Sequence, residues 1–296
     1  MNSIDIESKK FLGQPKNFVS IFNALLFDGQ QVLKPEYLKD ENSELVMNVS
    51  SKHVDIIKRY EDGTYLDLFV IESQSYVDPS MVARVMEYES VARMRYIRQN
   101  FKKHVPMHTR LPMILTVVLY VGESKWNAAK RLSELEIIHP GFEDMFNEFK
   151  LNLIELNTNH KYNTGEKATQ DFFDLLRMIY RKQILKEDLD REFNRDALYF
   201  AYVVTKNKEL LNIYQKNEKG DVKVCRALDE MFEESTNKGI QMGIKQGIEQ
   251  GVERGVKNTQ IKIAIKMLVR NNQTLEEISE IVGLDLDALR ELKKSI

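Results

Sequence analysis

The chain contains a single cysteine, Cys225, among its 296 residues, and it lacks long apolar runs. One cysteine excludes an internal disulfide and fits a reducing compartment. The longest apolar run, residues 112–121, is far too short to cross a bilayer, and residues 1–13 have no apolar core like that of a signal peptide. The sequence therefore predicts a soluble, cytoplasmic protein with no membrane partner.

An excess of charge and the motifs of several enzyme classes are also missing. The formal net charge is −2, so any affinity for nucleic acid has to come from a local basic surface. No glycine-rich loop ends in Gly-Lys-Ser or Gly-Lys-Thr, which argues against a nucleoside triphosphate site of that kind. The five histidines stand singly and form no pattern of zinc ligands or of a general base.

Helix and strand patterns alternate in the first half of the chain. Apolar residues recur at a spacing of three or four after Pro15, and Asp28-Gly29 ends this helical pattern. The following elements are expected as extended segments at 44–60 and 64–75, a helix at 78–101, a strand at 111–121, a helix at 126–135 and a strand at 150–156. Everything after about residue 169 has helical patterns. The fold class is therefore predicted as an α/β core followed by an all-helical C-terminal region.

Two acidic side chains and an amide interrupt the apolar pattern of the expected hairpin at residues 53–75. Asp55 stands on the first strand, and Glu72 and Gln74 occupy alternate positions of the second, where they share a face with apolar residues. They are either solvated residues on an exposed face of the hairpin or members of a site.

The turn of the hairpin decides whether the two acids share a face. If Asp62-Gly63 forms a two-residue turn, Glu61 pairs with Thr64, and Asp55 lies about 7–8 Å from Glu72 on the same face. A three-residue loop would instead turn Asp55 to the opposite face. Asp-Gly favours the two-residue turn unless a bulge intervenes.

Two carboxylates at the edge of an apolar core repel one another and lose solvation unless a cation neutralises them. Hard oxygen ligands favour Mg²⁺ or Mn²⁺ over zinc. Such an ion, held by Asp55 and Glu72, can bind a phosphodiester oxygen and orient a water molecule. The amide of Gln74 can then position that water or polarise the phosphate.

Five segments of the chain resemble a known family. In chain order they are F-N-A-L-L-F-D-G-Q-Q-V-L-K-P-E-Y-L, the hairpin segments H-V-D-I-I and V-I-E-S-Q-S, the helix start D-P-S-M-V-A-R-V-M-E-Y, and V-V-L-Y-V-G-E-S-K-W. Both these motifs and their order resemble those of the recombination-promoting nuclease (Rpn) family. This family is the transposase-labelled branch of the PD-(D/E)xK nuclease superfamily. The resemblance covers residues 15–130 well and extends more loosely through the helical half.

The resemblance implies a restriction-endonuclease-like core, in which a mixed sheet flanked by helices carries the metal ligands of a DNA endonuclease. Asp55 matches the strand-borne aspartate of the superfamily, and Glu72 matches the acidic residue of the (D/E)xK element. Gln74 replaces the lysine, as is usual in this branch, and so removes a cation that would stabilise the transition state. The first helix offers no convincing additional acid, which implies a single metal site.

A basic segment follows the hairpin. Between Arg84 and Arg110 the chain has seven lysines and arginines against two glutamates, and the densest part comprises Arg93, Arg95, Arg98, Lys102 and Lys103. These side chains either bind DNA phosphates without sequence preference or form an ordinary solvated surface. Arg84 belongs to an M-x-x-R pattern of the resembled family and is expected to orient the site or bind phosphate. Tyr120 resembles the Y-x-G corner of the family and is expected to be structural rather than catalytic.

Glycine occupies every fourth position from 239 to 255, and each glycine is followed by Ile or Val. Because each glycine costs about 1 kcal/mol in a helix relative to alanine, the repeat favours close contact with another helix over a flexible linker.

Residues 274–289 have the pattern of a helix–turn–helix with Gly283 at the corner, but the second helix lacks the basic residues of a DNA reader. A contact hairpin is therefore expected, and a related C-terminal fragment is a possible regulatory partner.

The predicted domains are a nuclease-like core at 1–165, a helical lobe at 166–238, a glycine-repeat helix at 239–257 and a C-terminal helical hairpin at 258–296. The expected function is that of a Mg²⁺-dependent DNA endonuclease with little sequence specificity that promotes recombination and forms homo-oligomers through its C-terminal helices. The alternative is a weak or inactive nuclease-fold protein that acts as a binding or regulatory module through these helices. An RNA-cleaving enzyme would use the same metal chemistry.

Overall fold

The computed structural model describes residues 3–40, 56–63 and 66–296. The contacts between residues divide the chain into two units, Met1–Asp229 and Glu230–Ile296, which are considered separately below. Among the helices of the described part, none is long and apolar enough to cross a membrane.

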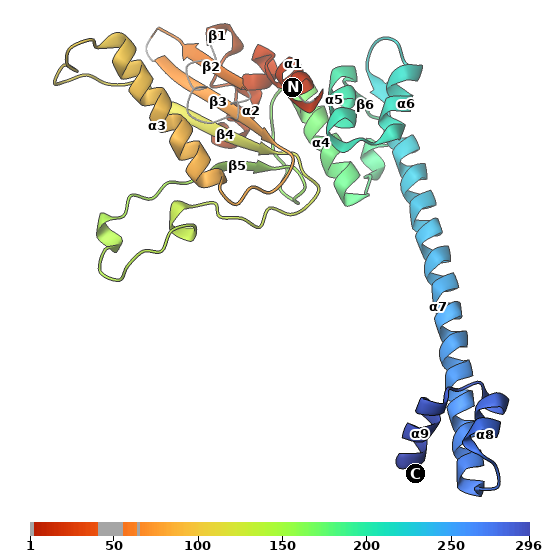
Figure 1. The fold of residues 1–296 in the computed structure, drawn as a ribbon. Helices are drawn as coiled ribbons and strands as arrows, with labels where there is room; N and C mark the ends of the chain where they lie inside the picture. Colours follow the sequence, from red (N-terminus) through yellow and green to blue (C-terminus); the bar gives the residue numbers. More distant parts are fainter. Residues whose placement is uncertain (1–2, 41–55, 64–65) are drawn as a thin grey trace. The chain divides into compact units, whose positions relative to one another are not determined.

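A five-stranded mixed sheet lies at the centre of the first unit (Figure 1). The strands, in spatial as well as chain order, are β1 (Leu38–Asp40), β2 (Ile56–Glu61), β3 (Leu66–Gln74), β4 (Ile114–Tyr120) and β5 (Asn152–Glu155). β1, β2 and β3 pair antiparallel, whereas β3, β4 and β5 pair parallel. The carboxyl ends of the three parallel strands therefore meet at one edge of the sheet.

Helices cover both faces of this sheet. On one face, α3 (Met81–Asn100) buries Val85 and Tyr88 against apolar residues of β2, β3 and β4. On the other face, α2 (Pro15–Phe27) places Phe22 on Phe69 of β3, with ring centroids 4.8 Å apart. α4 (Lys167–Arg181) packs beside α2, and a 2.8 Å hydrogen bond joins the hydroxyl groups of Ser20 and Thr169. This mixed sheet between helices is the predicted α/β core, and a long helical region follows it.

The pairing of the hairpin differs from both predicted registers. Glu61 pairs with Leu66 rather than with Thr64, so the connection spans four residues instead of two or three. Packing on both faces fixes this register: Ile57 pairs with Val70 beneath α3, while Tyr60 lies against Phe69 on the other face, with ring centroids 5.7 Å apart. Each residue of β2 pairs with a residue of β3 two positions beyond the one that the two-residue turn predicts. Because side chains alternate between the two faces of a sheet, this shift leaves every side chain on its predicted face.

Most of the predicted elements of the core are confirmed, but the helix expected at 126–135 is wrong. This segment is irregular apart from a short 3-10 turn, Leu132–Glu134. Its backbone is hydrogen-bonded to the chain before β5 instead: Leu132 N donates to Phe149 O, and Leu151 N donates to Lys130 O, both at 2.9 Å. The structure also adds α1 (Ser3–Leu12), for which the sequence patterns gave no prediction.

The rest of the first unit is mainly helical. α5 (Arg195–Thr205) and α6 (Lys208–Lys216) follow α4, and the chain turns between them at Lys206, whose φ is 56°. Two strands of two residues each, β6 (Glu192–Phe193) and β7 (Val222–Lys223), pair antiparallel and are an addition to the expected all-helical pattern.

The second unit contains the remainder of α7 (Cys225–Arg270), followed by α8 (Leu275–Val282) and α9 (Leu286–Lys294). The glycine repeat lies inside α7 and does not interrupt the helix. Gly283 has a φ of 71° and ends α8, as the sequence predicts for the corner of a helical hairpin. A small apolar cluster, formed by Ala264, Leu268, Ile278, Val282 and Leu289, joins the three helices.

Candidate active site

Glu72 and Gln74 lie at the carboxyl end of β3, on the face that α3 covers. Glu72 stands beside Val118 of β4, and Gln74 stands beside Tyr120. Each of the two polar residues is only 4% exposed. The Nε2 atom of Gln74 makes no hydrogen bond with any residue that the structure describes. A buried amide nitrogen without a partner is costly, which is why such groups often mark a place where a ligand or an ordered water binds.

Arg84 of α3 reaches from the helix to Glu72. Its Nη2 atom lies 2.9 Å from Oε1 of Glu72, and its Nη1 atom lies 2.6 Å from Oδ2 of Asp78. Nε and Nη2 also donate to the hydroxyl group of Tyr88, at 3.0 and 2.8 Å. The guanidinium is thus held on all sides, and its orientation fixes that of the Glu72 carboxylate.

The start of α3 explains why Arg84 is so well placed. Asp78 accepts hydrogen bonds at Oδ1 from the backbone nitrogen of Ser80, at 2.9 Å, and from its hydroxyl group, at 2.6 Å. A carboxylate at this end of a helix is favoured by the helix dipole. Arg84 and Tyr88 follow at intervals of about one turn on the same side of α3. Arg84 reaches Glu72 at the end of β3, and Tyr88 belongs to an apolar cluster with Leu68 and Val70 of the same strand.

Burial, hydrogen bonds and neighbouring charges shift the pKa values of Arg84, Asp78 and Tyr88, which form a cluster with Glu72. Burial tends to lower the pKa of Arg84, but the hydrogen bonds to Asp78 and Tyr88 and the charge of Glu72 outweigh it, so the pKa is raised. Burial tends to raise the pKa of Asp78, but the hydrogen bonds from Ser80 and Arg84 prevail, so this pKa is lowered. Burial and the charge of Glu72 raise the pKa of the Tyr88 phenol. Arg84 and Asp78 are therefore an ion pair at neutral pH.

The corner after β4 supports this end of the sheet. Tyr120 is 1% exposed, its hydroxyl group donates to Ser124 O at 2.7 Å, and its ring meets Trp126 edge-on. A Cβ atom at Gly122 would lie 2.6 Å from Ser75 O and 2.5 Å from Oη of Tyr120. Glycine is therefore required here because the chain passes so closely over the end of β3.

The basic segment extends away from Glu72. α3 begins beside the carboxyl end of β3 and runs back along the sheet, and its 1.5 Å rise per residue places Arg98 about 21 Å from Arg84 along the helix axis (Figure 1). Arg93 is paired with Glu89 at 2.8 Å. Arg98, Lys102 and Lys103 are exposed, and Arg95 is half-buried. Within the described part of the chain, Arg84 is the one basic residue predicted to contact DNA that donates a hydrogen bond to Glu72.

Asp55, the other predicted metal ligand, lies outside the described residues. Within the described part of the chain, no group of three or more histidine, cysteine or acidic side chains could hold a metal ion. The chemistry of Glu72 nevertheless suits Mg²⁺ or Mn²⁺, because a carboxylate is a hard oxygen ligand, and the amide of Gln74 offers a further oxygen on the same face of β3. Any metal bound here would also need ligands beyond these two side chains.

Two members of the cluster were not predicted as site residues. In the sequence, Asp78 serves only as part of a signal for the start of a helix. Tyr88 follows Arg84 by four positions, which is the spacing at which helical side chains become neighbours. That spacing would have indicated a contact between the two, but the sequence does not indicate that Arg84 also reaches Glu72.

One family model, described as "Putative transposase, YhgA-like", matches residues 9–210. The chain belongs to this family. The match covers the whole sheet and the helices α2 to α5, and it confirms the resemblance found in the sequence motifs. Membership of this YhgA-like transposase family supports a transposase- or nuclease-like role and DNA as a partner. No curated protein and no solved structure matched the chain.

Proposed function

We propose that this YhgA-like chain is a metal-dependent DNA endonuclease that hydrolyses phosphodiester bonds with little sequence specificity and thereby promotes recombination. The observation that supports this proposal is the buried position of Glu72 and Gln74 at the carboxyl end of β3, where Arg84 holds the Glu72 carboxylate at 2.9 Å. Burial of a carboxylate, and of an amide whose Nε2 atom has no partner among the described residues, does not stabilise the sheet.

In this function, Glu72 and Asp55 would hold Mg²⁺ or Mn²⁺, which would supply Lewis-acid chemistry to the phosphate. Arg84 keeps the carboxylate of Glu72 in one orientation, because its guanidinium is anchored in turn by Asp78 and Tyr88. The amide of Gln74 positions the attacking water or polarises the phosphate. The oxygen of water would form a bond to phosphorus as one phosphorus–oxygen ester bond breaks. The attacking water gives up one proton to solvent, and the leaving oxygen takes one up.

The DNA backbone is proposed to lie along α3 and the chain that follows it. The exposed ammonium and guanidinium groups of Arg98, Lys102 and Lys103 would contact phosphates without reading bases. Arg93 and Arg95 are assigned the same role, although Arg93 also pairs with Glu89. Binding through such contacts should weaken steeply as the salt concentration rises. The cytoplasm is the proposed compartment, since a nuclease acting in recombination needs access to DNA.

Homo-oligomers are proposed to form through α7. Five apolar side chains follow its glycines and are between 53% and 62% exposed: Ile240, Ile244, Ile248, Val252 and Val256. A Cβ atom at any of the five repeat glycines would meet nothing within 4 Å. The second copy would cover this stripe, and a related C-terminal fragment could do the same and regulate the chain.

A plasmid-nicking assay with Mg²⁺ tests the proposed cleavage. Wild type is compared with Asp55→Ala and Glu72→Ala, and Glu87→Ala, on the exposed side of α3, is the matched control. Nicking should fall by about 100-fold or more in both site variants and persist in the control. Equal nicking by all four proteins would indicate a contaminating nuclease and overturn the proposal. An RNA substrate of the same length distinguishes a DNase from an RNase.

A binding or regulatory module is the second candidate function. The ion pair of Arg84 with Oε1 of Glu72 favours it, because a guanidinium already occupies an oxygen that a metal would need. The exposed apolar stripe of α7 favours it as well. A chain that binds DNA and self-associates, but leaves plasmid intact with both Mg²⁺ and Mn²⁺, would have this function.

A further inference from the structure

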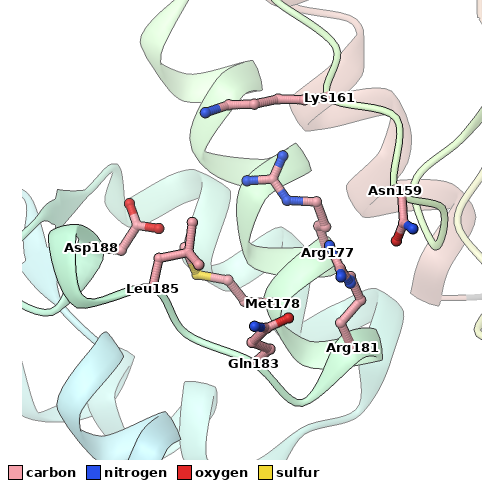
Figure 2. A pocket seen from close by; sticks show the side chains of 8 residues that line it. All are labelled: Asn159, Lys161, Arg177, Met178, Arg181, Gln183, Leu185 and Asp188. Carbon is pink, nitrogen blue, oxygen red and sulfur yellow. The ribbon is translucent and has the colours of Figure 1, made fainter.

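A basic pocket lies between the loop after β5 and the carboxyl end of α4, and none of its lining residues belongs to the candidate active site. The pocket has a volume of about 180 Å³. Lys161 extends over it from the loop, Arg177 and Arg181 line it from α4, and Asp188 faces them from the opposite side (Figure 2). Met178 and Leu185 supply apolar wall.

Two of its three cations have no partner in the described part of the chain. The side chains of Lys161 and Arg181 make no hydrogen bond or ion pair there, and both residues are exposed. Arg177 is more buried, with a side chain that is 15% exposed, and its Nη2 atom lies 2.8 Å from Oδ1 of Asp174. Asp174 also pairs with Arg191, at 2.8 Å, so its single negative charge is shared between two arginines.

The balance of charge indicates what the pocket binds. Three cations and the one carboxylate of Asp188 give the lining a net charge of two positive units. A phosphate monoester carries about −1.5 to −2 charges at pH 7, whereas a diester carries one. Two arginines one helical turn apart can also offer several donors to the same phosphate. The pocket is smaller than the about 300–1,000 Å³ of sites that enclose a whole drug-sized ligand, so it suits the phosphate end of a larger molecule.

The pocket lies near the edge of the sheet where the parallel strands end. The hydroxyl group of Tyr180, between the two pocket arginines and on the same helix, donates to Val121 O. Val121 follows β4, and its backbone nitrogen donates to Gln74 O at 2.9 Å. The loop that carries Lys161 begins after β5. Ligands of open α/β sheets bind outside the carboxyl ends of the strands, and the pocket is beside such an edge.

We propose that Lys161, Arg177 and Arg181 form a binding site for a phosphate monoester, carried by the end of a nucleic-acid strand or by a free nucleotide. The choice of a nucleic-acid source rests on the proposed function, whereas the affinity for a phosphate monoester rests on the pocket alone. Asp188 disfavours a second anion at the far side of the pocket, and Leu185, which is 45% exposed, leaves an apolar surface beside the phosphate for the attached sugar.

Binding measured in EDTA separates this site from cleavage, because no metal is then present to support hydrolysis. The probes are fluorescent single strands of one sequence with a 5′-phosphate, a 3′-phosphate or neither, and unlabelled dAMP, deoxyadenosine and inorganic phosphate are the competitors. The wild-type chain should bind at least one phosphorylated strand or dAMP about tenfold more tightly than its unphosphorylated counterpart. A preference among strands indicates a strand end, and a preference seen with dAMP alone indicates a free nucleotide.

The double variant Lys161→Ala/Arg181→Ala should lose this preference, since neither side chain has a partner whose loss would disturb the fold. The charge-matched control is Lys216→Ala/Lys219→Ala, at exposed positions away from the pocket residues. A wild-type chain that does not distinguish phosphorylated from unphosphorylated probes would overturn the proposal. A preference that survives in the double variant, or that disappears equally in the control, would overturn it too. Plasmid nicking of the same proteins is scored separately and reports only on the active site.

Discussion

Arg84 is held between two carboxylates: its Nη2 atom lies 2.9 Å from Oε1 of Glu72, and its Nη1 atom lies 2.6 Å from Oδ2 of Asp78. The side chains of all three residues are nearly buried, with exposed fractions of 14%, 5% and 10% for Arg84, Glu72 and Asp78. Water therefore screens their interaction weakly. The guanidinium both neutralises the acids and links the first turns of α3 to the end of β3.

Removal of this guanidinium should destabilise the fold. Arg84→Ala leaves two buried carboxylates without their shared cation, and the loss of one partner of a buried ion pair costs about 3–5 kcal/mol. The free energy of unfolding, measured by urea denaturation, should fall by that amount. Arg98→Ala, an exposed position on the same helix, should change it by less than about 0.5 kcal/mol. Similar values for the two variants would show that Arg84 has no such role.

The stability of the first unit should depend on pH through Asp78. Because the pKa of Asp78 is lowered in the folded chain, its contribution is fully present above the unfolded value, near 3.8, and is lost as the pH falls through the folded pKa. Asp78→Asn should therefore be less stable than wild type at pH 7, and the difference should shrink below about pH 4. Urea midpoints between pH 7 and pH 3 measure this, with the exposed Asp144→Asn as the matched substitution. A constant difference over that range would contradict the assignment.

Two glycines should respond in opposite directions to the same substitution. Gly122→Ala puts a methyl group 2.6 Å from Ser75 O, and such overpacking costs about 1–3 kcal/mol. Gly243→Ala adds the same group to α7, where nothing lies within 4 Å, and should stabilise the helix by about 1 kcal/mol. Thermal unfolding of both variants gives the sign of each effect. A tolerated Gly122→Ala would mean that the corner after β4 can relax.

The elements that the sequence predicts correctly are those with a local signal. The helix after Pro15, the helix after Asp78 and the apolar strand β4 all have start or stop residues or an unbroken apolar run. The helix expected at 126–135 fails because the backbone there is paired with residues around Phe149, a contact that no local pattern encodes.

The site shows the same division between local and long-range information. The face of Glu72 and Gln74 follows from alternation along β3, which survives a register shift of two residues. The register itself depends on the packing of Phe69 and Val70 against helices on opposite faces, so the turn sequence alone gave the wrong pairing. The contact of Arg84 with Glu72 joins a helix to a strand twelve residues away and appears only with the fold.

The glycine repeat of α7 should be needed for association rather than for the helix. Replacing Gly239, Gly243, Gly247, Gly251 and Gly255 with alanine should strengthen the isolated helix by up to about 1 kcal/mol per residue, because alanine has the higher helix propensity. The added methyl groups should also keep a second helix from approaching as closely, so the dissociation constant of the oligomer should rise by about tenfold or more.

Sedimentation equilibrium over a range of concentrations measures that constant, and thermal unfolding at low concentration measures the helix. The control is Lys245→Ala/Glu249→Ala, which changes exposed polar positions of the same helix and leaves the glycines in place. Tighter association of the five-alanine chain would mean that the stripe from Ile240 to Val256 binds through its side chains alone. In that case the glycines would not be the point of contact. The tighter association would then arise because a more rigid helix with the same apolar side chains loses less conformational entropy on binding.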